Sequence, residues 1–289
     1  MGVYLRPQAL EDALDALSET PLAILAGGTD FYPARVSKPL DDDVLDITAI
    51  DALRGIERHG DAWRIGALAT WTDLIRAELP AAFDGLKAAA REVGGVQIQN
   101  AGTIAGNLCN ASPAADGVPS LMALDAAIEL SSVGGTRNVP LADFITGNRG
   151  TVRAADELVT GIVVPDPGAG TQSTFLKLGA RKYLVISIVM AGFVIEPDGD
   201  AVGRARLAVG ACSPVARRLA ALEAALTGKP LDATLGDHVT ADHLKAALAP
   251  IDDVRGSAEY RWDAALTVVR RGLSELGERM AGAQMVGRR

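Results

Sequence analysis

The sequence contains little cysteine and little histidine. Its two cysteines, Cys109 and Cys212, lie far apart in 289 residues, and the three histidines are equally dispersed. A disulfide framework or a four-thiolate zinc site needs more cysteines than this, and an iron–sulfur cluster normally takes four thiolates. We therefore expect no metal site in this chain, and any redox role must use an organic cofactor.

Clusters of positive charge and long apolar runs are absent as well. The net charge is −8 with no block of Lys or Arg, which argues against nucleic acid as the main partner. The longest apolar stretch, 184–195, is interrupted by Ser187 and Gly192 and is too short to span a bilayer. Charged residues begin too early for a signal peptide. These absences predict a cytoplasmic chain with no membrane span.

The first half of the chain reads as mixed α/β structure. Leu10, Leu14 and Leu17 predict a helix over 7–19, and apolar runs predict strands over 22–26 and 44–47, which together form a small α/β unit up to about residue 55. Helices at 71–79, 80–93 and 117–125 and strands at 127–132 and 158–164 follow. The Gly- and Asn-rich passage 94–110 predicts no regular element.

Paired prolines and glycines at 165–170 predict a linker, because they disfavour continued regular structure. Beyond it we expect strands at 175–179, 189–196 and 204–210 and helices at 214–227, 240–249 and 258–281. The chain is thus predicted to be α+β, with a first domain over 1–168, whose subdomains are about 1–55 and 56–168, and a second domain over 169–289.

The first chemical feature is a glycine pair, Gly27 and Gly28, directly after the strand at 22–26. Two glycines allow the backbone to turn through positive φ, to gather successive N–H groups into one concavity, and to let an anion approach closely. The alternative is a plain turn with no ligand. By itself this feature does not decide between the two.

The second feature is the run Thr103-Ile104-Ala105-Gly106-Asn107, which continues to Asp116 with small residues, hydroxyls and amides. A surface loop would normally carry Lys or Glu, so this composition indicates close approach by a ligand. The alternative is a buried irregular loop that satisfies its own backbone through its asparagines. Neither a G-x-G-x-x-G motif after a strand nor a P-loop is present, so a dinucleotide would need another fold.

Taken together, these motifs resemble a known family. A-G-G-T-D, then T-I-A-G-N with S-P-A-A-D, then F-L-K-L-G-A-R-K, G-A-C-S-P and S-A-E-Y-R follow one another over nearly the whole chain. The series resembles the FAD-binding subunits of the molybdenum hydroxylases, the xanthine dehydrogenase and carbon monoxide dehydrogenase flavoprotein group. The resemblance implies a vanillyl-alcohol-oxidase-type FAD domain of two α/β subdomains, followed by a smaller domain with a short antiparallel sheet and helices.

The resemblance also implies which residues contact FAD. The first pyrophosphate loop would be Ile24, Leu25, Ala26, Gly27, Gly28, Thr29, Asp30 and Phe31, and the second would be Thr103, Gly106 and Asn107. Asp116 would hold a ribose or ribityl hydroxyl, with a helix N-terminal charge as the alternative. Val93 and Val159 would contact the rings, or else belong to the core. Many relatives have glycine where Ala105 stands, and a methyl group is tolerable there if φ stays negative.

Lys177 would lie beside the isoalloxazine, where an ammonium stabilises negative charge on the reduced ring. The alternative is that strand alternation points Lys177 at solvent. No side chain is predicted to act as nucleophile or general acid, so we expect no catalytic residue and no metal ligand in this chain.

The implied function is that of an FAD-binding electron-transfer subunit. Electrons would pass from the [2Fe–2S] clusters of a small partner subunit, after substrate oxidation at the molybdenum cofactor of a large partner subunit, to an external acceptor. NAD, a quinone, a cytochrome and oxygen all stay open as that acceptor. The alternatives are a self-contained flavin oxidase or reductase and a non-catalytic assembly subunit.

Overall fold

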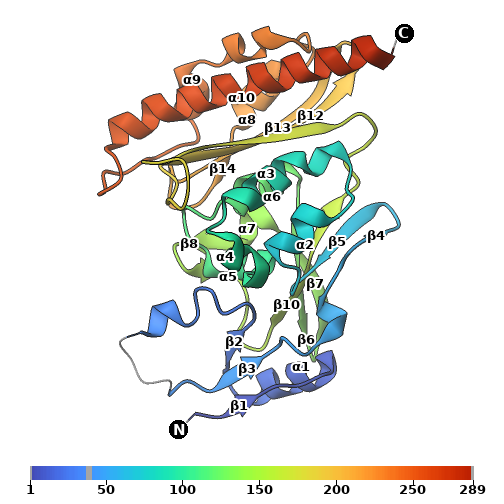
Figure 1. Ribbon diagram of the computed structural model, residues 1–289, viewed down its shortest axis with the longest axis vertical. Helices are drawn as coiled ribbons and strands as arrows, with labels where there is room; N and C mark the ends of the chain where they lie inside the picture. Colours follow the sequence, from blue (N-terminus) through green and yellow to red (C-terminus); the bar gives the residue numbers. More distant parts are fainter. Residues whose placement is uncertain (1, 37–40, 288–289) are drawn as a thin grey trace. The chain divides into compact units, whose positions relative to one another are not determined.

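The protein is described by a computed structural model that covers residues 2–36 and 41–287, with side chains described up to residue 283 (Figure 1). The chain divides into two compact units, and each unit is built from several segments. Unit 1 comprises Met1–Ala77, Gly94–Ala111 and Ala126–Asp166, and unit 2 comprises Glu78–Val93, Ser112–Asp125 and Pro167–Arg289. Two short segments from the first half of the chain therefore fold with its C-terminal part.

Unit 1 begins with a three-stranded parallel sheet in the order β1-β3-β2. Its strands are β1 (Tyr4–Leu5), β2 (Ala23–Leu25) and β3 (Val44–Asp46). Helix α1 (Leu10–Glu19) connects β1 to β2 and buries Ala13, Leu14 and Leu17, which recur at helical spacing. The predicted helix and both predicted strands are present, and the turn after β2 carries the glycine pair.

The second sheet of unit 1 has five strands in the order β4-β5-β10-β6-β7, and all neighbours are antiparallel. The strands are β4 (Ile56–His59), β5 (Ala62–Gly66), β6 (Ala127–Ser132), β7 (Gly135–Pro140) and β10 (Leu158–Pro165). Strand β7 was not expected from the sequence. It is a polar, mostly exposed edge strand, and it forms because a two-residue turn pairs it with β6.

The helices of unit 1 include two in the passage 94–110, where the sequence predicts no regular element. They are α4 (Val96–Ala101) and α5 (Ile104–Asn110). Both are too short to show a periodic pattern, and glycine and asparagine lower the local helix propensity. The remaining short elements of this unit are α2 (Trp71–Arg76), α7 (Leu141–Phe144), η1 (Pro33–Arg35), η2 (Asp51–Leu53) and the hairpin of β8 (Ile145–Gly147) and β9 (Gly150–Thr151).

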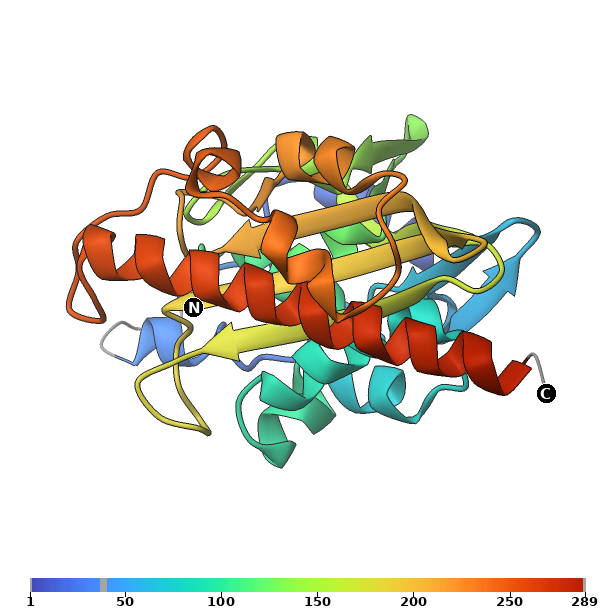
Figure 2. The ribbon, with the colours of Figure 1, turned by 90° about the horizontal axis from the view of Figure 1, so that it is seen from above.

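Unit 2 is built on a four-stranded antiparallel sheet in the order β11-β12-β13-β14. The strands are β11 (Gln172–Leu178), β12 (Val189–Asp198), β13 (Ala201–Gly210) and β14 (Arg217–Arg218). Figure 2 shows the long helix α10 (Ala258–Gly287), in red, lying across the yellow and orange strands. Helices α3 (Asp84–Glu92) and α6 (Gly117–Ala123) also pack against these strands, and η3 (Ala81–Phe83) leads into α3.

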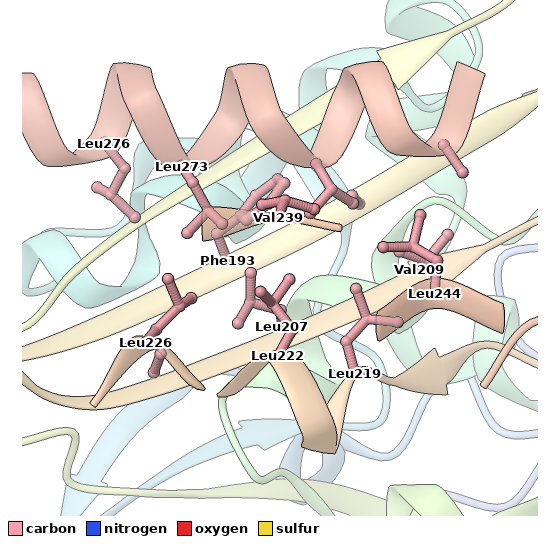
Figure 3. Packing of buried hydrophobic residues seen from close by; sticks show 14 of the residues in the cluster. Phe193, Leu207, Val209, Leu219, Leu222, Leu226, Val239, Leu244, Leu273 and Leu276 are labelled. Atoms are coloured by element: carbon pink, nitrogen blue, oxygen red, sulfur yellow. The ribbon is translucent and has the colours of Figure 1, made fainter. Parts of the chain in front are cut away.

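The core of unit 2 is formed by the sheet and its C-terminal helices (Figure 3). Phe193 and Leu207 from the strands belong to one buried cluster with Leu273 and Leu276 from α10, and Val209 lies beside Leu244 in the same cluster. Helices α8 (Ala220–Leu226) and α9 (Ala241–Lys245) and the segment η4 (Ala233–His238) complete this core. Seven consecutive residues of strand β12 are buried, because helices α6 and α10 both pack against this strand.

Two details of unit 2 differ from, or extend, the sequence interpretation. The helix predicted over 214–227 begins at Ala220, because Arg217 and Arg218 instead pair with β13. Within the S-A-E-Y-R motif, the buried guanidinium of Arg261 donates to the carbonyl oxygens of Ile188 and Ala211 at 2.6 and 2.8 Å. This motif and the G-A-C-S-P motif therefore lie together. Arg261, near the start of α10, links the residue before β12 to the residue after β13.

Candidate functional site

The glycine turn after β2 presents backbone N–H groups that have no protein partner. Within the described residues, the N–H groups of Gly27, Gly28, Thr29 and Asp30 donate no hydrogen bond. Gly28 has a φ of +71°, and a Cβ there would lie 2.9 Å from the ring of Tyr32. Consecutive free N–H groups at a positive-φ glycine form an anion-binding nest. The turn thus has the geometry expected of a pyrophosphate loop.

The second loop is ordered by its own threonine. The hydroxyl of Thr103 caps α5 by accepting from the N–H of Gly106 at 3.0 Å, and the N–H of Ile104 donates to Ala69 at 3.0 Å. The side-chain oxygen Oδ1 of Asn107 is buried without a hydrogen-bond partner among the described residues. Buried amide oxygens are normally paired, so this atom is available to accept a hydrogen bond from a ligand hydroxyl or from water. Ala105 is helical, so its methyl group causes no strain.

The two loops are in direct contact within unit 1. A Cβ on Gly27 would overlap the carbonyl group of Ala101 and would lie 3.0 Å from Cα of Gly102. A Cβ on Gly102 would in turn lie 3.3 Å from Oγ1 of Thr29. Only residues without a side chain allow this approach. The structure therefore brings together the two segments that the sequence places about 75 residues apart.

Arg149 joins both loops and was missed by the sequence interpretation. It lies in the turn between β8 and β9 with a φ of +58°. Its backbone N–H donates to the carbonyl oxygen of Ala111 at 3.2 Å, and its guanidinium lies 3.3 Å from Oδ2 of Asp30. The only local signal was the turn sequence Gly147-Asn148-Arg149-Gly150, which does not reveal a contact with Asp30 across 119 residues of chain.

The candidate residues of unit 2 form a buried ion pair. Nζ of Lys177, on β11, lies 2.6 Å from Oδ2 of Asp116, and the two side chains are 6% and 9% exposed. The hydroxyl of Ser187 donates to Oδ1 of the same carboxylate at 2.5 Å. Lys177 also reaches the carbonyl oxygen of Glu92, at 3.5 Å. The alternative in which Lys177 faces solvent is therefore wrong, and the sequence interpretation missed Ser187.

The environment of Asp116 raises the pKa of its carboxyl group. Burial is the largest cause, and the ammonium of Lys177 and the hydroxyl of Ser187 act in the opposite direction. Asp116 occupies the N-cap position of α6, yet its side chain makes no cap hydrogen bond. Asp116 therefore does lie at a helix N-terminus, as the alternative expects, but its carboxylate is directed to Lys177 and Ser187 and not to the helix N–H groups.

The remaining predicted residues are placed as follows. Among residues 24–31 only Leu25 is fully buried, and the other seven are partly exposed. The ring of Phe31 carries the guanidinium of Arg35 at 3.7 Å from its centroid. Val159 lies in β10, pairs with Leu130 of β6 and is 4% exposed, which places it in the core. Val93, in unit 2, follows α3 and is half-buried.

Comparison with known proteins assigns both parts of the chain to one kind of subunit. Residues 1–167 match the family described as FAD binding domain in molybdopterin dehydrogenase, and residues 174–276 match the CO dehydrogenase flavoprotein C-terminal domain. The chain belongs to the molybdopterin dehydrogenase FAD-binding family. It is a medium, FAD-binding subunit of a molybdenum hydroxylase-type dehydrogenase, an oxidoreductase, and FAD is its cofactor.

Individual relatives of this FAD subunit agree with that assignment. The nicotinate dehydrogenase FAD-subunit of Eubacterium barkeri is 38% identical over 213 residues, which are 69% of this chain and 70% of the relative. The carbon monoxide dehydrogenase medium chain of Hydrogenophaga pseudoflava is 29% identical over 284 residues, 96% and 98% of the two chains. Both relatives are named as one subunit of a dehydrogenase.

Solved structures confirm the predicted fold class of the FAD subunit. A structure of carbon monoxide dehydrogenase from Hydrogenophaga pseudoflava aligns with a TM-score of 0.86 and 30% identity, and covers 95% of this chain and 96% of that one. A Cu,Mo-CO dehydrogenase aligns with a TM-score of 0.87 and 28% identity. In the part of the chain that the structure describes, no helix combines the length and apolar character needed to traverse a bilayer.

Proposed function

We propose that this chain carries electrons, through its FAD, from the [2Fe–2S] clusters of a small partner subunit to an external acceptor. Substrate would be oxidised at the molybdenum cofactor of a large partner subunit. The shortage of cysteine supports this division of work, because two cysteines cannot hold a cluster here. The relatives named as medium subunits support it too. We place the complex in the cytoplasm and leave open whether the acceptor is NAD.

The observation that carries this proposal is the nest of free N–H groups at Gly27–Asp30, in contact with the second loop. A pyrophosphate accepts several N–H bonds at once, and these groups require such an acceptor or water. Oδ1 of Asn107 is free to accept a hydrogen bond, which a ribose or ribityl hydroxyl would supply when FAD is bound. The residues present in unit 1 therefore fit the pyrophosphate and sugar portions of FAD.

Charge at these loops also fits an anionic ligand. Asp30 is the only charged residue between Leu22 and Phe31, and the passage 93–115 contains no charged residue. A carboxylate next to a pyrophosphate is repelled unless a cation offsets it. Arg149 provides that cation and is anchored to both loops. We therefore add Arg149 to the predicted residues that bind FAD.

In unit 2 we propose that Asp116 and Lys177 contact the flavin part of FAD, with Val93 near the rings. FAD, when bound, supplies the chemistry of accepting and releasing electrons. The chain's own residues bind the cofactor and set its electrostatic surroundings. Because Lys177 is neutralised by Asp116, the pair acts as an oriented dipole with no net charge. No described side chain in this arrangement needs to act as nucleophile or general acid.

Purification of the full chain and an absorption spectrum test the proposal. Bound oxidised flavin absorbs at about 375 and 450 nm, and we expect both bands in the purified chain or after addition of FAD. A colourless chain that takes up no FAD contradicts the proposal. Co-purification with a cysteine-rich small chain and a large chain, followed by anaerobic addition of substrate, should bleach the band at about 450 nm. Bleaching by substrate in the isolated chain would instead support a self-contained flavin enzyme.

A further inference from the structure

Asp116 holds both ends of one exposed loop. The loop is the segment 179–186 between β11 and β12, and we call it the β11–β12 loop. Lys177 precedes it and Ser187 follows it, and their side chains bind the two oxygens of the Asp116 carboxylate at 2.6 and 2.5 Å. One carboxylate at the N-terminal end of α6 thus links Lys177, near the end of β11, to Ser187, two residues before β12 begins.

Ser187 is almost completely shielded from bulk solvent. It is 1% exposed, and Asp116 is also buried. A buried carboxylate is tolerated only when its lone pairs are satisfied, and here each oxygen has one direct donor. The bond from Ser187 is therefore needed for the ion pair to keep its geometry.

The conformation of the β11–β12 loop depends mainly on how its two ends are held. Tyr183 and Leu184 are 65% and 59% exposed, so few core contacts hold the loop from inside. Arg181 braces it internally by donating to the carbonyl oxygens of Tyr183 and Leu184. This brace shapes the loop, but it does not connect the loop to the rest of unit 2.

We propose that Ser187 is a positioning residue: its hydroxyl fixes the Asp116 carboxylate, and through it both Lys177 and the base of the β11–β12 loop. The part of this proposal that concerns flavin rests on the proposed function, because it assumes that Asp116 and Lys177 face FAD. The part that concerns the loop does not. The two parts are therefore tested by separate measurements.

The first experiment measures the loop in the chain without added FAD. Trypsin cleaves after Lys and Arg, and Arg181 and Lys182 are exposed. With Ser187→Ala we expect cleavage after these residues to be about tenfold faster, since loss of one buried hydrogen bond is worth about that factor in a local opening equilibrium. Ser187→Thr keeps a hydroxyl and should be cleaved at nearly the wild-type rate.

A matched control comes from the same strand region. Ser173 on β11 is also buried, and its hydroxyl accepts from the N–H of Gly85 at 2.7 Å, away from the loop. Ser173→Ala should leave cleavage after Arg181 and Lys182 unchanged. Equal acceleration in Ser173→Ala and Ser187→Ala would mean general destabilisation and would overturn the proposal. No acceleration in Ser187→Ala would overturn it as well.

The second experiment measures the flavin potential against pH in the FAD-loaded chain. The groups facing Asp116 are Lys177 on β11, Glu92 on α3 and Ser187. Both hydrogen bonds favour the ionised carboxylate, so removing the one from Ser187 moves protonation of Asp116 to higher pH. Below that pH Lys177 has no counter-charge, and the added positive charge raises the reduction potential of a nearby flavin.

For Ser187→Ala we expect this rise in potential to begin at a higher pH than in the wild type, and Ser187→Thr should restore the wild-type profile. A purely structural role of Ser187 would lower FAD content without moving the profile. An unmoved profile in a variant that binds FAD would overturn the role of Ser187 toward flavin. A wild-type chain that binds no FAD would contradict the proposed function instead, and the trypsin result would still stand.

Discussion

Replacement of Lys177 by methionine is expected to destabilise unit 2 strongly. Lys177→Met keeps the length and apolar stem of the side chain but removes the ammonium, which lies 2.6 Å from Oδ2 of Asp116. The carboxylate stays buried, at 9% exposure of its side chain, with Ser187 as its one remaining direct partner among the described residues. Breaking a buried pair from one side typically costs about 3–5 kcal/mol.

This cost is a large share of the stability of an ordinary protein, which is about 5–15 kcal/mol. At about 2.1 cal/mol/K of unfolding entropy per residue, it corresponds to a fall in the melting temperature of roughly 5–8 °C for a chain of 289 residues. The double variant Asp116→Asn with Lys177→Met removes both charges, and it should recover most of the loss. Lys245→Met is the matched control, since Lys245 is exposed, pairs only loosely with Asp242 at 3.4 Å, and should change stability by less than about 0.5 kcal/mol.

The effect of pH follows from the pKa of Asp116. Burial already raises this pKa in the folded protein, and loss of Lys177 removes the main opposing charge, so the pKa rises further. A raised folded pKa means that stability is lost as pH rises from the unfolded pKa to the folded pKa. The deficit of Lys177→Met should therefore be larger at about pH 8 than at about pH 5.

Urea unfolding followed by circular dichroism at both pH values measures these free energies of unfolding. The reasoning is refuted if Lys177→Met stays within about 1 kcal/mol of the wild type, or if the effects of Asp116→Asn and Lys177→Met simply add. In FAD-loaded protein we also expect Lys177→Met to lower the flavin reduction potential, because a positive charge near the reduced ring is lost.

Three further predictions concern other positions. Gly27→Ala should abolish FAD binding, measured by flavin fluorescence, because a Cβ there overlaps the second loop, whereas Gly134→Ala, with only an ordinary contact at 3.5 Å, should bind normally. Arg149→Asn, which suits the positive φ, should weaken FAD binding about tenfold and riboflavin binding hardly at all; equal losses would contradict a role at the pyrophosphate. Gly272→Ala should cost about 1–3 kcal/mol in urea unfolding, since its Cβ overlaps the ring of Phe193, and a variant as stable as the wild type would show that α10 shifts freely.

Much of this protein could be predicted from its sequence because the decisive signals are local. Two adjacent glycines after a strand indicate a backbone turn through positive φ whatever the rest of the chain does, and Gly28 has that conformation. The family and the cofactor follow from such motifs in order, and both are confirmed. The division of the sequence near residue 168 stays a prediction, and the predicted FAD contacts stay proposals.

Only the tertiary structure decided which distant residues meet. Asp116 lies 61 residues from Lys177 and 71 from Ser187, so no spacing rule relates them, and strand alternation alone could have turned Lys177 to solvent. Their meeting depends on segment 112–125 folding with the C-terminal part of the chain. A glycine's conformational freedom is a property of one residue and is visible in sequence. The pairing of a buried charge depends on how several distant segments pack together. That packing is visible in the tertiary structure and not in the sequence.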